Sequence, residues 1–423
     1  MLSRLVKRTI SISAFRGYIA NPELAKYIIS PPYDVLDSNE ARIMAQNNKC
    51  SFLRVNKPEI ELSPETDPYS EAVYLKGYEN LQKFIRRGWL IREPVRRLYI
   101  YELTMNSRTQ IGIVSESSID DYSNNLIKKH ELTRAKKEQD RTKLTETQKA
   151  NVGPVFLTYK AKAEIDNIVQ QIIQKKPHID VTTNDEVRHR LWKCNTGENR
   201  KIIDEFKLID KCYIADGHHR AASAYNVARK FKDQAIKEGK DITGDEDFNS
   251  FLSIHFPHNQ LKIYDYNRVV KDLGGKSSKT LISELSSSFE VSEIIDPKPQ
   301  RKHMFSMFLE GKWWGLRLKA EVNEQNPIER LDSQILTNLC LKPILGIDDL
   351  TKSDRIDFVG GIRGLKELEK RCHEDCQVAF ALYPVDVEEV MAVADAGLIM
   401  PPKSTWFEPK PRSGLVVRVF DSK

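Results

Sequence analysis

One segment, Lys211–Phe231, combines a short strand with a long helix and constrains the fold more than any other stretch. Its first residues, Lys211–Ala215, are typical of a buried strand, and Asp216-Gly217 follows directly as a turn. Apolar residues then recur at offsets 0, 3, 4, 7 and 10, the spacing of one helix face: Ala221, Ala224, Tyr225, Ala228 and Phe231. A strand that runs through a tight turn into a helix predicts a sheet with a helix packed against it.

Short strands and helices alternate through the rest of the chain. Strands are expected at 97–104, 110–115, 154–159, 188–193, 251–256, 304–309, 313–318 and 378–382, and helices at 71–87, 142–150, 166–174, 335–341 and 387–395. This alternation predicts the α/β or mixed α+β class. A length of 423 residues suggests two or three domains. We expect an N-terminal α/β region at 1–95, a central core at 96–275 and a C-terminal α+β domain at 276–423.

The net charge of the chain is small for its length. The 66 Lys and Arg residues against 60 Asp and Glu residues give +6. Such a mild excess argues against a heavily basic protein that binds long nucleic acids, although a local basic site is compatible with it. The longest apolar stretches, such as Met391–Met400, are well short of the roughly 18 residues that cross a bilayer. We therefore expect neither a membrane nor a long nucleic acid as a partner.

Cysteine usage and the N-terminus bear on the cellular compartment. Six cysteines are too sparse for a disulfide framework, which favours a reducing compartment. Cys372 and Cys376 are the one close pair, and no second pair lies at zinc-ligand spacing. Met1–Ala20 is basic, contains serines and lacks acids, so it fits a mitochondrial presequence. A short basic tag before a strand at Thr9–Ala14 is the reading we favour, so we expect a cytoplasmic protein, with mitochondrial import as the alternative.

The turn Asp216-Gly-His-His-Arg220 has the strongest chemical character in the chain. Gly217 lets the backbone approach a ligand closely, and the next amides lie at a helix N-terminus, which attracts anions. Arg220 can grip a phosphate or carboxylate with two hydrogen bonds. His218 and His219 add donors, and either could titrate near neutral pH. Asp216 could hold a metal, a sugar hydroxyl or the end of the helix. The alternative is that Asp216 is only a helix cap and that both histidines are surface residues.

A second candidate lies upstream, in the segment 128–149. It contains eight Lys or Arg residues and four Asp or Glu residues, a local charge of +4. His130 and Glu131 stand at its start, while Arg134, Lys137 and Arg141 share one face if the segment is helical. A carboxylate beside that face could act as a general base while the cations bind phosphate. The alternative is a solvated, charged helix.

Two proline-bounded loops are weaker candidates. Pro401–Pro409 presents Lys403, Ser404 and Thr405 on a rigid loop, and Pro31–Asp34 presents Tyr33 and Asp34. These five polar side chains are candidates for substrate binding, with structural packing as the alternative. The chain has no P-loop, no GxGxxG after a strand, no GxSxG and no HExxH.

Four motifs together resemble the DUF1015 family, and the chain is identified on them as a member. They occur in the expected order and span nearly the whole chain: Pro31-Pro-Tyr-Asp-Val35, Lys129-His-Glu131 with Asp140-Arg141, Ile214-Ala-Asp-Gly-His-His-Arg220 and Met400-Pro-Pro-Lys-Ser-Thr405. The family is named as one without a known function, so this resemblance by itself implies no reaction.

A more distant resemblance is more informative about chemistry. The Asp-Gly-His-His-Arg turn is similar to the turn of the ParB/sulfiredoxin-like fold, in which free serine kinases carry a His-Glu upstream of the same turn. The resemblance implies that Glu131 deprotonates a serine hydroxyl, that Asp216 assists the substrate or Mg²⁺, and that Gly217–Arg220 bind the phosphates of ATP or ADP. His130 and Arg141 would add to phosphate binding, and His218 would take part in catalysis. Glu131 and Asp216 are 85 positions apart, so the resemblance requires insertions into a compact core.

Three functions remain open on these residues. The first is a nucleotide-dependent phosphotransferase that makes phosphoserine from free serine. The second is a hydrolase or phosphatase that acts on a phosphorylated metabolite such as phosphoserine. The third is a ParB-like module that binds a nucleotide or DNA without catalysis. A small molecule of the serine or phosphoserine class and a nucleotide are the expected partners, and a homodimer is compatible with the sequence.

Overall fold

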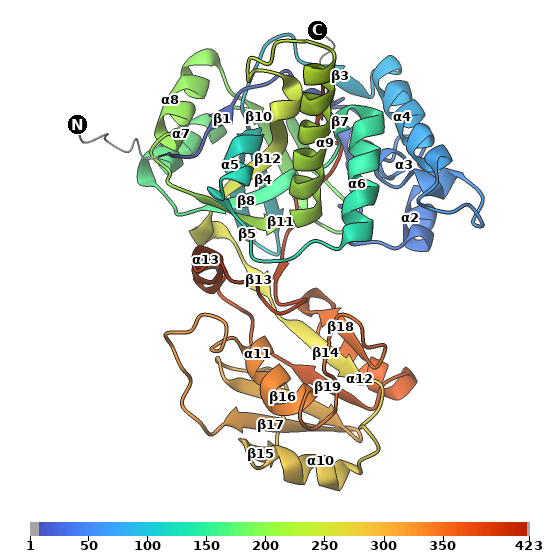
Figure 1. The fold of residues 1–423 in the computed structure, drawn as a ribbon, viewed down its shortest axis with the longest axis vertical. Helices are drawn as coiled ribbons and strands as arrows, with labels where there is room; N and C mark the ends of the chain where they lie inside the picture. The colour runs from blue at the N-terminus through green and yellow to red at the C-terminus, as the bar shows by residue number, and fades with distance from the viewer. Residues whose placement is uncertain (1–7, 421–423) are drawn as a thin grey trace. The chain divides into compact units, whose positions relative to one another are not determined.

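The computed structural model describes residues 8–420 of the chain. It divides into two compact units, the first formed by residues 1–261 and 409–423 and the second by residues 262–408. Figure 1 shows the chain leaving the first unit, forming the second and returning to the first for its last strand. This division differs from the three ranges expected from the sequence. Ranges 1–95 and 96–261 share one unit because β1 (Ile12–Ser13) pairs with β5 (Arg108–Ser118).

A nine-stranded mixed sheet forms the centre of the first unit. Its order is β6-β11-β8-β12-β5-β4-β10-β9, with β1 added beside β5. Two pairs are parallel, β6 with β11 and β8 with β12, and the other pairs are antiparallel. The remaining strand bounds are Tyr99–Met105 (β4), Ile127–Lys128 (β6), Val155–Tyr159 (β8), Ile179–Thr182 (β9), Arg188–Lys193 (β10), Cys212–Asp216 (β11) and Ser250–Pro257 (β12). The mixed sheet and its helices confirm the expected mixed α/β class.

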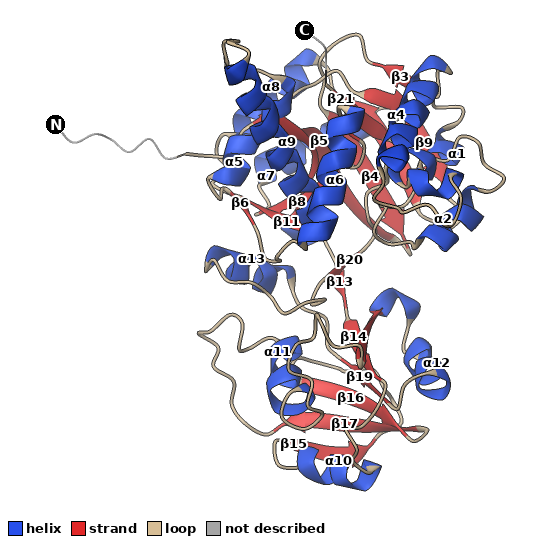
Figure 2. Cartoon of the chain, turned by 45° about the vertical axis from the view of Figure 1, so that its right-hand side comes forward, coloured by secondary structure: helices blue, strands red, loops and turns tan. Residues whose placement is uncertain are grey.

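Helices cover one face of this sheet and bury an apolar core against it. The core joins residues of α5, α7, α8 and α9 to sheet residues such as Ile113, Leu157 and Ile214. The helix bounds are Ile119–Ser123 (α5), Ala163–Ile173 (α7), Thr196–Phe206 (α8) and His218–Lys237 (α9). The helix α6 (Ala135–Gln148) runs beside α9 (Figures 1 and 2), and Asn226 donates to Glu138 across the pair at 2.7 Å. A helix was expected at 142–150, and α6 starts seven residues before that range, at Ala135.

The N-terminal and C-terminal segments meet in a second, smaller sheet of the first unit. Its order is β3-β2-β21-β7, so the last strand lies between two strands from the first part of the chain. The strand bounds are Leu90–Arg92 (β3), Tyr18–Ala20 (β2), Val416–Val419 (β21) and Ala150–Asn151 (β7). Four helices accompany this region: Ala25–Ile28 (α1), Ser38–Ala45 (α2), Leu53–Asn56 (α3) and Glu71–Arg86 (α4). Asp37 caps α2 in a reciprocal capping box with Glu40, as the sequence around Asp37 predicts.

The second unit is an antiparallel sheet with helices on both faces. Its order is β15-β17-β16-β19-β14-β18, and β13 pairs with β20 apart from it. The strand bounds are Ile263–Tyr264 (β13), Tyr266–Val270 (β14), Phe289–Glu293 (β15), Met304–Leu309 (β16), Lys312–Leu318 (β17), Ile356–Gly360 (β18), Val378–Ala381 (β19) and Trp406–Phe407 (β20). The helix bounds are Ser278–Leu285 (α10), Asp332–Leu336 (α11), Lys366–Glu374 (α12) and Val387–Asp395 (α13). Because β14 belongs to this sheet, the second unit begins before the expected boundary at residue 276.

The structure bears on the N-terminal segment and on the question of membrane-spanning helices. The expected N-terminal tag falls partly on residues 1–7, which lie outside the described residues, while the strand after it is β1. Within residues 8–420, no helix combines the length and the apolar character that a membrane span requires.

Candidate active site

The turn between β11 and α9 has the geometry that its sequence predicts. Gly217 caps α9 with a φ of 102°, which is the left-handed region that favours glycine. A Cβ atom at this position would come within 3.0 Å of the Arg220 guanidinium. Among the described residues no side chain caps the start of α9, and the first amides of a helix have no partner within it. The helix N-terminus is therefore available to an anion.

Two cations hold the carboxylate of Asp216. The Lys410 ammonium lies 2.8 Å from Oδ1, and the Arg220 guanidinium donates to Oδ2. Burial opposes ionisation of this carboxyl group, but Lys410 and then Arg220 outweigh it and hold the pKa of Asp216 well below its usual range. Asp216 is therefore ionised at neutral pH and holds the two cations, Lys410 and Arg220, beside the turn.

Arg220 links the turn to two other segments. Its guanidinium donates to the carbonyl oxygen of Pro154 and lies 4.0 Å from the Asp34 carboxylate. Burial opposes its charge, while Asp216 and Asp34 favour it and raise the pKa of Arg220 above its ordinary value. The side chain is thus a fixed cation between the turn and the Pro31–Asp34 loop.

The loop that carries Glu131 lies directly against the start of α9. Oε2 of Glu131 is 3.7 Å from Nδ1 of His218. The rings of His130 and His218 meet at right angles with their centres 4.6 Å apart. Burial and then the neighbouring His130 hold the pKa of His218 well below its usual range, and burial also lowers the pKa of His130. The structure therefore brings together the two motifs that are 85 positions apart in the sequence.

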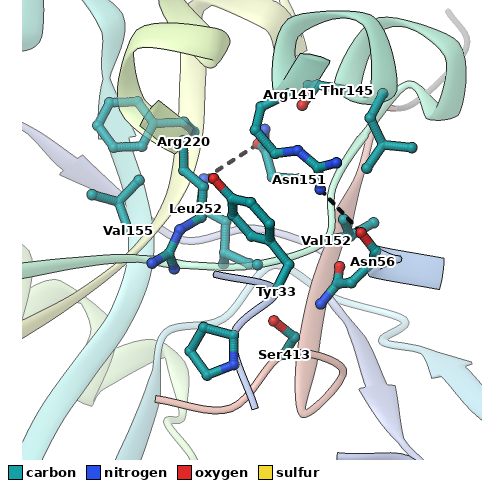
Figure 3. Close-up of a pocket in the computed structure, with 14 residues that line it drawn as sticks. Tyr33, Asn56, Arg141, Thr145, Asn151, Val152, Val155, Arg220, Leu252 and Ser413 are labelled. Carbon is teal, nitrogen blue, oxygen red and sulfur yellow. Dashed lines mark hydrogen bonds between the residues drawn. The ribbon is translucent and has the colours of Figure 1, made fainter. Parts of the chain in front are cut away.

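Tyr33, Arg141 and Arg220 line one pocket of the first unit. Figure 3 shows the Tyr33 ring between the two arginines, and the Arg141 guanidinium carbon is 4.2 Å from the ring centre. Arg141 also donates to the Asn56 carbonyl at 3.0 Å and pairs with Asp140 at 2.7 Å. The space that these side chains leave has room for about two water molecules. A ligand of nucleotide size therefore needs Tyr33 to move or must bind outside this pocket.

The expected Mg²⁺ site meets a difficulty in the surroundings of Asp216. Both oxygens of this carboxylate already accept from cations, one from Lys410 and the other from Arg220. Within the part of the chain that the structure describes, no group of three or more His, Cys, Asp or Glu side chains could hold a metal ion. The donor set does not fit direct ligation of Mg²⁺ by Asp216.

The second proline-bounded loop belongs to the second unit. The hydroxyl of Ser404 is buried and bonds with Ser333 at 3.0 Å and with the Pro401 carbonyl at 2.8 Å. The Lys403 ammonium lies 5.5 Å from the ring centre of Tyr266. Thr405 lies between these residues and β20. The structure therefore shows packing partners for Lys403 and Ser404 within their own unit.

Lys410, which holds Oδ1 of Asp216, is not among the residues predicted from the sequence. This lysine directly follows Pro409, the last residue of the loop singled out above, and it is the first cation of the segment that returns to the first unit. It lies 194 positions from Asp216, so no periodicity could have joined the two residues. The available signal was a lysine between two prolines, Pro409 and Pro411, because prolines restrict where its backbone can go.

The structure resembles several solved proteins at low identity. They include a free serine kinase in complex with AMP, at 15% identity over 73% of this chain and 91% of that chain with a TM-score of 0.36. A mutant of free serine kinase in complex with ADP matches at 15% identity over 73% and 92% with a TM-score of 0.36. SbnI with a C-terminal truncation, from Staphylococcus aureus, matches at 13% identity over 72% and 87% with a TM-score of 0.37. These values do not establish a shared activity.

The amino-acid sequence was also compared with curated proteins and with models of protein families. A search of curated proteins found no match. The model of one family, described as a protein of unknown function, matches residues 12–334, which is more than half of the chain. This match confirms the family expected from the four motifs and covers the first three of them. The chain belongs to the DUF1015 family.

Proposed function

We propose that the first unit is a nucleotide-dependent phosphotransferase that phosphorylates a small hydroxyl acceptor, with free serine as the leading candidate. One observation carries the proposal: the Glu131 carboxylate lies 3.7 Å from His218, the first residue of α9. A candidate base and a helix N-terminus that can hold phosphates are therefore neighbours. Phosphoryl transfer depends on these two parts more than on covalent chemistry by the protein.

The turn can receive an anionic substrate without net repulsion from its own side chains. Lys410 and Arg220 offset the negative charges of Asp216 and of Asp34, whose carboxylate lies 4.0 Å from Arg220. The amides of His218, His219 and Arg220 point along α9 toward the same place, where the helix dipole is positive. Phosphate oxygens are the anion that such a combination of amides and guanidinium binds best.

Glu131 is suited to the proton-transfer step. Its side chain is partly exposed, so an acceptor molecule can reach it from solvent. In the proposed reaction Glu131 takes the proton of the serine hydroxyl, whose oxygen forms a bond to the terminal phosphorus atom as the bond to the leaving phosphate oxygen breaks. The products are phosphoserine and the nucleotide shortened by one phosphate, and the proton leaves from Glu131 to water.

The test is formation of phosphoserine by the purified full-length protein. Serine is incubated with ATP or ADP, and the product is measured by mass spectrometry. Glu131→Gln should lower the rate about 10²–10⁴-fold, which is the usual contribution of a general base. The matched control is Glu164→Gln, at an exposed position in the first turn of α7, and it should keep the rate of the unmodified protein.

The outcomes separate the candidate functions. Equal rates for Glu131→Gln and the unmodified protein would remove Glu131 from the mechanism. Absence of phosphoserine with either nucleotide would refute the kinase. Release of inorganic phosphate from phosphoserine without any nucleotide would establish the phosphatase alternative at the same residues.

A further inference from the structure

The loop that carries Glu131 is attached to α9 on both sides of that residue. On one side the backbone N–H of His130 donates to Nε2 of His218 at 3.4 Å. On the other side the backbone N–H of Arg134 donates to Nε2 of His219 at 3.0 Å. Two consecutive residues of one helix therefore hold two amides that are four positions apart in the loop.

The direction of these hydrogen bonds determines the state of both imidazoles. A backbone N–H can only donate, so each Nε2 must accept. An accepting Nε2 carries no proton, which assigns the neutral form with the proton on Nδ1 to both rings. Burial lowers the pKa of His218 and of His219, with a further contribution from Lys137 at His219, in agreement with neutral rings.

The same tautomer aims His218 at Glu131. With Nε2 accepting from the loop backbone, the proton on Nδ1 faces the Glu131 carboxylate across 3.7 Å. Adjacent residues of a helix point about 100° apart, which explains how His218 reaches the residue before Glu131 while His219 reaches three residues beyond it. Both histidines are needed because one ring could hold only one end of the loop.

We propose that His218 and His219 are positioning residues that clamp the 130–134 loop onto α9 and thereby fix Glu131 beside the helix N-terminus. This reassigns both rings, which the sequence had suggested as a catalytic group and a phosphate ligand. Only the consequence for catalysis rests on the proposed function, since the clamp itself is a property of the unliganded chain. Phosphate binding at the turn is then left to the amides, Arg220 and Lys410.

The clamp is tested by hydrogen exchange at single amides of the full-length protein without any substrate. His219→Leu removes the acceptor but keeps an apolar side chain of similar length. The Arg134 amide should then exchange about fivefold faster, because a hydrogen bond of average strength is lost. His219→Gln should restore protection, since its side-chain oxygen reaches about the place of Nε2. Unchanged exchange at Arg134 in His219→Leu would overturn the clamp.

A matched control exists elsewhere in the first unit. The Ala161 amide donates to Nδ1 of His258 at 3.0 Å, which is the same kind of bond away from the loop. His258→Leu should speed exchange at Ala161 and leave Arg134 as it is. If His219→Leu does not fold, His219→Gln and His219→Asn replace it, because the shorter Asn side chain cannot reach Arg134. Equal exchange at Arg134 in those two variants would also overturn the proposal.

Nucleotide binding distinguishes a clamp from a phosphate ligand. Isothermal titration with ADP should give an affinity for His219→Leu within about threefold of that of the unmodified protein, while kcat for phosphoserine falls and KM for the nucleotide changes little. A tenfold or larger loss of ADP affinity with normal exchange at Arg134 would make His219 a ligand and refute the clamp. If no protein binds ADP and none makes phosphoserine, the proposed function fails, whereas the exchange result still decides the clamp.

Discussion

Lys410 offers a sharp test of how the candidate site is held together. Exchanging it for Met keeps much of the apolar stem and removes the ammonium that lies 2.8 Å from Asp216. The carboxylate is then left with Arg220 as its main cation. Because both side chains are largely buried, at 11% and 21% exposure, solvent cannot replace the lost charge well.

The expected loss of stability follows from this geometry. At a distance of 2.8 Å and an effective dielectric constant of about 20, the attraction is about 6 kcal/mol. Relief of the desolvation of Lys410 offsets part of it, and breaking a buried pair usually costs 3–5 kcal/mol. Since Arg220 still partners the carboxylate, we expect the lower end, about 3 kcal/mol. Lys230→Met is the control, because its ion pair with Glu146 is half exposed and should contribute at most about 1 kcal/mol.

Urea unfolding at two pH values checks both the magnitude and its origin. The pKa of Asp216 is held below its ordinary value, so its ionisation stabilises the fold above about pH 4 and this contribution is lost as the pH falls further. Burial raises the pKa of Asp216, while Lys410 and Arg220 lower it. Without Lys410 only Arg220 of these two cations opposes the effect of burial, so the pKa of Asp216 rises. The penalty of Lys410→Met should thus be full at pH 7 and shrink at pH 3. An equal penalty at both pH values would refute the reasoning.

Three further changes test packing and titration. Arg418→Met breaks a buried ion pair with Glu116 and should lower the free energy of unfolding by about 3–5 kcal/mol, measured in urea. Gly217→Ala, with φ at 102° and a guanidinium 3.0 Å away, should lower Tm more than Gly239→Ala, where φ is 67° and the space is open. Burial raises the pKa of Asp332 to about 7, so stability present below about pH 4 falls as the pH rises through 7. Asp332→Asn should flatten that profile of urea midpoints, and an unchanged slope would contradict it.

Local sequence patterns predicted those helices and strands whose apolar spacing lies within one segment. The strand expected at 188–193 and the helix expected at 387–395 coincide with β10 and α13. The helix after Gly217 also forms, because its apolar face and its glycine cap agree. In each case the periodicity lies within a single element, so no partner had to be known.

Long-range pairing could not be predicted in the same way. Nothing within Val416–Val419 indicates that this last strand lies between β2 and β7. The second unit therefore interrupts the first one, an arrangement that local propensities cannot reveal. Lys410 was missed for the same reason, because its interaction with Asp216 depends on where the chain returns after residue 408.

His218 and His219 make different hydrogen bonds from those that the sequence motif suggested. Their sequence position at the start of α9 made them candidate donors to a phosphate, yet in the structure Nε2 of His218 and of His219 accepts from the backbone. Residue type fixes which groups can bond, whereas only the folded loop decides which ones do. The sequence could therefore single out these residues, but it could not show which hydrogen bonds each ring makes.

The charge balance at the turn connects the stability of the site with its proposed function. A phosphate at the start of α9 would lie near the negative charge of Asp216, which alone would repel it. Lys410 and Arg220 together carry two positive charges, which offset Asp216 and the Asp34 carboxylate 4.0 Å from Arg220, so these four side chains do not repel an anion. Lys410→Met leaves Arg220 alone against Asp216 and Asp34, and the variant should therefore bind ADP more weakly even under conditions where it remains folded. A folded Lys410→Met protein with unchanged ADP affinity would show that the phosphates bind away from this turn.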